Sequence, residues 1–107
     1  MSPFADVLAR LAATIESRKG AEVSASYTAK LLGDPSLAAK KLGEEAIEAV
    51  IAATQGDKAA LAAESADLIY HWLVVLAATG VSLDDVAAKL EAREGTSGLA
   101  EKAARGG

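Results

Sequence analysis

The segment Lys41-Leu42-Gly43-Glu44-Glu45-Ala46-Ile47-Glu48-Ala49-Val50 carries three carboxylates within five residues of an otherwise apolar, alanine-rich stretch. At 100° per residue, the acidic side chains share one side of a helix and most apolar side chains lie opposite them. The segment therefore predicts an amphipathic helix. On this helix alone the acidic residues can form a solvated face, with Lys40 and Lys41 as partners at i, i+4.

Helical signals continue on both sides of this segment. Capping residues and glycine stops predict helices over about 3–19, 27–32, 35–54, 58–79 and 83–93, and the sequence shows no strand pattern. The expected fold class is all-α, a bundle of four main helices. The length of 107 residues fits a single domain over 1–107, with 95–107 as a candidate flexible tail.

Composition narrows the class of protein. The net charge of -4 argues against a general nucleic-acid binder, and the absence of cysteine suits a reducing cytoplasm. The most apolar run, 68–78, is about half the roughly 20 residues of a membrane helix, so no membrane partner is expected. A small, alanine-rich core favours a homo-oligomer, a dimer or higher.

The expected helix 58–79 carries a second polar group. Glu64, Asp67 and His71 share one of its faces at i, i+3 and i+7. From 68 to 78 nearly every other position is apolar, so we expect this helix to be buried on most sides. A carboxylate in line with a buried seam is costly unless it is paired or bound to a metal.

The short turn between 35–54 and 58–79 predicts an antiparallel hairpin in which these acidic positions come level. Up to five carboxylates then converge: Glu44, Glu45, Glu48, Glu64 and Asp67. Their mutual repulsion calls for a cation, and an all-oxygen ligand set selects Mg²⁺ or Mn²⁺. A di-iron centre would need Glu-x-x-His on two helices, and the sequence has one histidine.

Glu44-Glu45-x-x-Glu48 and Glu64-x-x-Asp67 resemble the signature of the MazG-like, all-α nucleoside triphosphate pyrophosphatases. Other motifs make the chain similar to the phosphoribosyl-ATP pyrophosphatase family over about Leu8 to Arg105. These motifs are Ser26-Tyr27-Thr28-x-Lys30-Leu31, Lys41-Leu42-Gly43-Glu44-Glu45, Ala66-Asp67-Leu68-x-Tyr70-His71 and Ser97-Gly98-Leu99-x-Glu101-Lys102-x-x-Arg105.

The resemblance implies Mg²⁺-dependent hydrolysis of phosphoribosyl-ATP to phosphoribosyl-AMP and pyrophosphate, the second step of histidine biosynthesis. Glu45, Glu48, Glu64 and Asp67 are then the expected metal ligands. Glu44 is either a ligand of a second ion or the general base, and Glu45 is the other candidate for catalysis. The sequence does not separate these roles.

Seven residues are candidates for substrate binding, and each also has an ordinary structural explanation. Cations in a last helical turn offset the macrodipole, Lys41 can pair with Glu45, tyrosine and histidine can be packing residues, and the basic tail can be solvated. The seven are Arg18, Lys19, Tyr27, Lys41, His71, Lys102 and Arg105.

Two other functions stay open. One is a house-cleaning pyrophosphatase of ordinary or damaged nucleotides on the same fold and metal site. The other is a non-enzymatic helical interaction module with a solvated acidic face. The tail pattern 97–105 favours phosphoribosyl-ATP as substrate over the house-cleaning alternative.

Overall fold

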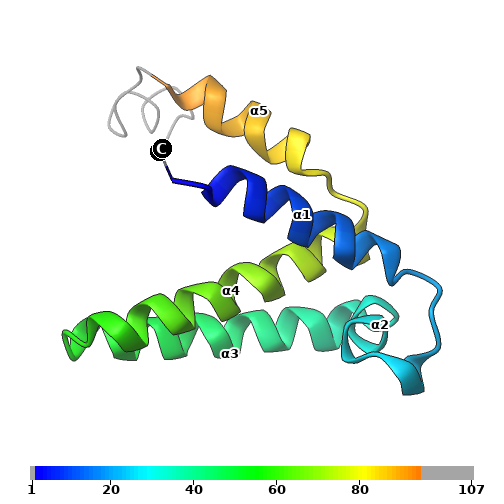
Figure 1. Ribbon diagram of the computed structural model, residues 1–107, viewed down its shortest axis with the longest axis horizontal. Helices are drawn as coiled ribbons and strands as arrows, with labels where there is room; N and C mark the ends of the chain where they lie inside the picture. The colour runs from blue at the N-terminus through cyan, green and yellow to red at the C-terminus, as the bar shows by residue number, and fades with distance from the viewer. Residues whose placement is uncertain (1, 95–107) are drawn as a thin grey trace, which may run out of the picture.

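A computed structural model describes residues 2–94 and contains no strand within that range. Within these residues the chain forms five α-helices and one 3-10 turn, arranged as Figure 1 shows. In chain order they are α1 (Phe4–Ser17), η1 (Val23–Ala25), α2 (Tyr27–Leu32), α3 (Pro35–Thr54), α4 (Lys58–Thr79) and α5 (Leu83–Arg93). The all-α prediction is confirmed, and the ranges of the three middle helices agree with those expected from the sequence.

Side-chain caps set the starts of the later helices. Asp34 Oδ1 accepts a hydrogen bond from the Leu37 N–H at 3.1 Å to open α3. Asp57 caps α4 in the same way, and Ser82 begins α5 in a reciprocal capping box. Gly80 ends α4 at a φ of 79°, a left-handed conformation that favours glycine. The start of α1 differs slightly from expectation, because Pro3 occupies the N-cap position itself.

Helices α3 and α4 form the expected antiparallel hairpin and lie side by side along their length (Figure 1). Helix α2 packs against the opening of this hairpin, and α1 packs on the C-terminal half of α4. The buried cluster where these helices meet consists of Ile15, Leu31, Ala38, Leu73 and Val74. Toward the 55–57 turn, α1 and α5 diverge from the hairpin.

The expectation that α4 is buried on most sides is wrong for a single chain. Only His71, Leu73 and Val74 of this helix are buried, and 17% of its most apolar 18-residue window lies inside the molecule. By length and composition α4 could cross a membrane, a test that the core helix of a soluble protein also passes. The reason for its exposure is geometric: α3 covers one side of α4, and α1 and α2 pack only against the half of α4 that follows Asp67.

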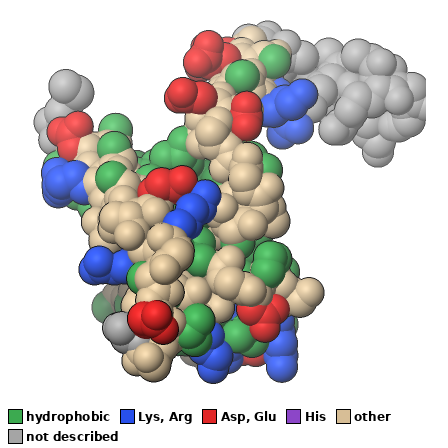
Figure 2. Space-filling view, turned by 90° about the vertical axis from the view of Figure 1, so that its right-hand side faces the viewer, with side chains coloured by type: hydrophobic (Ala, Val, Ile, Leu, Met, Phe, Trp, Pro, Cys, Tyr) green, Lys and Arg blue, Asp and Glu red, His purple; other side chains and the backbone are tan. Residues whose placement is uncertain are grey.

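Figure 2 shows the charge distribution on one face of the described chain. Lysine and arginine side chains are scattered among acidic and apolar ones, and no extended basic area forms on this face.

Candidate metal centre and substrate site

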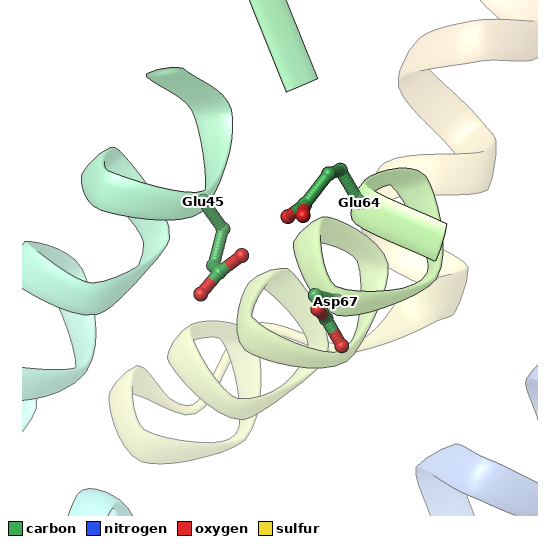
Figure 3. A group of neighbouring side chains, drawn as sticks. All are labelled: Glu45, Glu64 and Asp67. Atoms are coloured by element: carbon green, nitrogen blue, oxygen red, sulfur yellow. The ribbon is translucent and has the colours of Figure 1, made fainter. Parts of the chain in front are cut away.

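Three carboxylates meet on one side of the α3–α4 hairpin. Glu45 comes from α3, and Glu64 and Asp67 come from successive turns of α4 (Figure 3). One oxygen of each carboxylate lies within 4.8 Å of the others. Glu45 and Glu64 are half-buried and Asp67 is exposed. These three residues are called the acidic group below.

The acidic group raises the pKa of one of its own members, Glu64. Partial desolvation raises the pKa of Glu64, and the negative charges of Glu45, Asp67 and Glu48 raise it further. A side-chain hydrogen bond to Glu45 adds to the increase. The protonated form of Glu64 is therefore favoured when nothing positive balances these charges.

The acidic group suits a hard divalent cation. Its donors are all carboxylate oxygens, the ligand type that Mg²⁺ and Mn²⁺ prefer. Because one oxygen from each of the three carboxylates already lies within 4.8 Å of the others, Glu45, Glu64 and Asp67 could hold one such cation together.

The other two acidic candidates lie outside this group. Glu44 is exposed and pairs with Lys41, their charged atoms 3.5 Å apart. Glu48 is exposed but close enough for its charge to raise the pKa of Glu64. Convergence thus involves three carboxylates with Glu48 nearby. From the sequence, the structural explanation for Lys41 was an ion pair with Glu45. In the structure Lys41 pairs with Glu44 instead.

An aromatic group adjoins Asp67 at its C-terminal side. The His71 Nδ1–H donates a hydrogen bond of 2.8 Å to the backbone carbonyl of Asp67. The His71 ring is buried and meets Tyr70 edge to face at 4.9 Å and Tyr27 at 6.4 Å between ring centroids. Tyr27 is 51% exposed, so its ring is available to a ligand.

The sequence did not reveal how α2 is fixed beside this group. The hydroxyls of Thr28 and Tyr70 are hydrogen-bonded to each other, and this bond ties α2 to α4. Both residues stand in the motifs quoted above, but no local spacing rule brings positions 42 residues apart into contact. Only the packing of the two helices does so.

The basic candidates of α1 lie elsewhere in a single chain. Lys19 pairs with Glu16 at 2.9 Å and borders two grooves, of about 390 and 570 Å³, at the Gly80 end of α4. That end is about 18 Å from Asp67 at 1.5 Å per residue. Arg18 follows α1 as its exposed C-cap residue. Lys102 and Arg105 lie outside the described residues.

The fold and the acidic group together define an all-α protein with a carboxylate centre suited to a divalent metal ion. The chain belongs to the phosphoribosyl-ATP pyrophosphohydrolase family, whose model matches residues 8–94.

Curated relatives agree with this assignment over nearly the full chain. The chain is similar to the phosphoribosyl-ATP pyrophosphatase of Caulobacter vibrioides (strain NA1000 / CB15N), with 75% identity over 94% of each chain. The phosphoribosyl-ATP pyrophosphatase of Caulobacter sp. (strain K31) is 71% identical over 98% of each chain. That of Cereibacter sphaeroides (strain ATCC 17029 / ATH 2.4.9) is 62% identical over 94% of this chain and 98% of the relative.

Proposed function

We propose that this chain hydrolyses phosphoribosyl-ATP to phosphoribosyl-AMP and pyrophosphate, in the cytoplasm, as the second step of histidine biosynthesis. The family match and the names of the relatives support the substrate. The single structural observation that carries the chemistry is the convergence of Glu45, Glu64 and Asp67. The bond cleaved is the α–β phosphoanhydride.

The acidic group would hold Mg²⁺, or Mn²⁺ in its place, and Glu48 stands close enough to complete the ligand set. Bound Mg²⁺ would neutralise phosphate charge and lower the pKa of a coordinated water. A carboxylate of α3 accepts the proton that the attacking water loses, and Glu44 and Glu45 are the two candidates. The Glu44 side chain is exposed to solvent, and one of its oxygens lies 3.5 Å from the Lys41 ammonium.

Other side chains would bind the organic part of the substrate. The half-exposed ring of Tyr27, with the buried His71 ring beside it, offers an aromatic surface for the adenine base near Asp67. Lys41, which lies on α3 one turn before Glu45, would contact a phosphate. Arg18, Lys19, Lys102 and Arg105 remain predicted phosphate contacts.

A pyrophosphate-release assay tests this proposal. Purified protein with Mg²⁺ should release pyrophosphate from phosphoribosyl-ATP far faster than from ATP or dUTP. The variant Asp67→Asn serves as the control for contaminating activity. Equal or faster turnover of ATP or dUTP would favour a house-cleaning pyrophosphatase, and no turnover of any nucleotide would favour an interaction module.

We also propose that the active form is a homo-oligomer. The apolar core of the described chain is small, with seven buried hydrophobic residues. Much of the apolar surface of α4 is left partly exposed. A second copy would bury this surface, and the small-core argument from the sequence points the same way.

A further inference from the structure

Phosphoribosyl-ATP has a second charged end that the acidic group does not serve. It differs from ATP by a ribose phosphate attached to the adenine base, so phosphate groups lie on both sides of the base. A phosphate monoester carries a charge of about −1.5 to −2 at pH 7. Mg²⁺ at the acidic group would neutralise the triphosphate, and the ribose phosphate on the other side of the base needs a cation of its own.

Helix α2 extends away from the acidic group along α4. At its start, the Tyr27 ring lies 6.4 Å from the ring of His71, which is one helical turn past Asp67. At its end, Gly33 lines the same groove as Gly80, the C-cap residue of α4. From His71 to Gly80 the helix rises about 13 Å, at 1.5 Å per residue. A ligand that runs from the acidic group past Tyr27 therefore continues along α2.

Lys30 lies on the exposed side of α2, one turn after Tyr27. At 100° per residue the two positions are about 60° apart around the helix, and both side chains are exposed. The neighbouring Ala29 and Leu31 are 5% and 0% exposed and anchor α2 in the core. The backbone that carries Lys30 is therefore held in place, and its side chain is on the same side of α2 as the Tyr27 ring.

The charge of Lys30 is not used within the part of the chain that the structure describes. Lys30 is the only charged residue of α2 and forms no ion pair there. Lys19 and Lys41, in contrast, each pair with a glutamate. An exposed lysine is ordinary on a protein surface. What distinguishes Lys30 is its place past Tyr27, on the side of that ring away from the metal centre.

We propose that Lys30 binds the phosphate of the phosphoribosyl group and thereby distinguishes phosphoribosyl-ATP from ATP. The triphosphate lies at the acidic group, the adenine lies against Tyr27, and the ribose phosphate reaches Lys30. The contact is strong because both partners are charged. ATP lacks this phosphate, so the contact stabilises only the complex with phosphoribosyl-ATP. This inference rests on the proposed function and assigns Lys30 to binding, not to the chemical step.

Steady-state kinetics with two substrates test the inference. Lys30→Gln should lower kcat/KM for phosphoribosyl-ATP by about 10–100-fold, the range for a lost hydrogen bond to a charged group. The change should fall mainly on KM, because the ground state and the transition state share the contact. For ATP, kcat/KM should change by less than about threefold. Lys30→Arg keeps the charge and should recover most of the loss.

Lys58→Gln provides the matched control. It removes the same charge from an exposed lysine at the start of α4, on the other side of the acidic group from α2. It should change kcat/KM for either substrate by less than about threefold. Thermal melts of the variants at Lys30 and Lys58 should match wild type, because both positions are exposed and glutamine has a helix propensity close to that of lysine.

Calorimetric titration with Mg²⁺ gives a readout that does not depend on turnover. Phosphoribosyl-AMP keeps the ribose phosphate and AMP lacks it, and neither contains the bond that is cleaved. Wild type should bind phosphoribosyl-AMP more tightly than AMP, and Lys30→Gln should remove most of this difference. An equal loss for both ligands, or unchanged binding of phosphoribosyl-AMP, would overturn the inference alone. A wild-type chain that releases no pyrophosphate from phosphoribosyl-ATP would reject the proposed function and this inference with it.

Discussion

The carboxylates of Glu45 and Glu64 point toward each other across the α3–α4 hairpin, with Asp67 on the same side (Figure 3). Each of these groups is negative when ionised, and their proximity raises the pKa of Glu64. The metal-free chain therefore holds repulsion that a divalent cation would relieve. The first two predictions follow from this relationship.

Mg²⁺ should stabilise the wild-type chain. Binding to the folded state alone contributes about 2.7 kcal/mol when the free ion is at 100 times its Kd. For a domain of this size that corresponds to an increase of about 10–20 °C in melting temperature. Asp67→Asn should abolish most of this increase and most pyrophosphate release. Thermal melts with EDTA or Mg²⁺ at matched ionic strength measure the effect, and no Mg²⁺-dependent shift in wild type at millimolar ion would reject the metal centre.

The pH dependence of the metal-free chain should carry the signature of Glu64. Because its pKa is raised from 4.5 in the folded state, the folded chain binds more protons than the unfolded chain between the two pKa values. Stability from this group is therefore lost as pH rises through that window, and the loss is complete above the folded pKa. In EDTA, Glu64→Gln should melt higher than wild type at pH 7.5 and show a flatter profile from pH 4.5 upward. A variant that melts lower at pH 7.5 would contradict the repulsion.

The sequence predicted the hairpin and the acidic group because both depend on local periodicity. The cap residues Asp34 and Asp57 mark where the two long helices begin. The short turn between these helices requires them to pack antiparallel. The sequence predicted that up to five carboxylates converge, and in the structure three do so. The reason is geometric. Glu44 lies 100° around α3 from Glu45, so the two cannot both face α4.

What the sequence could not supply was the environment around the hairpin. Apolar residues on nearly all sides of α4 predicted burial, but burial needs neighbours, and one chain provides them on few sides. The contact between Thr28 and Tyr70 depends likewise on how α2 crosses α4. Periodicity identifies which face of a helix is apolar and does not identify what covers it.

Amide variants of the two glutamates should separate metal binding from proton transfer. Glu45→Gln removes a member of the acidic group and should reduce both the Mg²⁺-dependent increase in melting temperature and kcat. If Glu44 is the base, Glu44→Gln should lower kcat by about 10²–10⁴-fold while keeping that increase. Single-turnover rates with and without Mg²⁺, beside the thermal melts, measure the two effects. Full activity in Glu44→Gln would assign the proton to Glu45.

Removal of the C-terminal segment after Gly98 should impair use of the substrate without disturbing the metal centre. The deleted part contains Lys102 and Arg105, which the family resemblance marks as substrate contacts, whereas the acidic group lies entirely on α3 and α4. We expect a higher KM, a lower kcat, or both, with an unchanged Mg²⁺ response in thermal melts. Charge-neutral variants at these two positions in the full chain provide the control for deletion. An unchanged kcat/KM would exclude a role for this segment.

The hydrogen bond between Thr28 and Tyr70 should connect stability to substrate binding. Each hydroxyl is partly buried, so removing one by Thr28→Val or Tyr70→Phe leaves the other without this partner and should lower stability by about 1 kcal/mol. The double variant should lose less than the sum of the two, because no partner is left unpaired. Tyr27 precedes Thr28 and contacts His71, so loosening α2 should also raise KM more than it lowers kcat. A double-mutant cycle of urea unfolding measures the loss of stability, and steady-state kinetics on the same variants measure KM and kcat. Additive losses with an unchanged KM would show that the bond neither couples the two helices nor positions Tyr27.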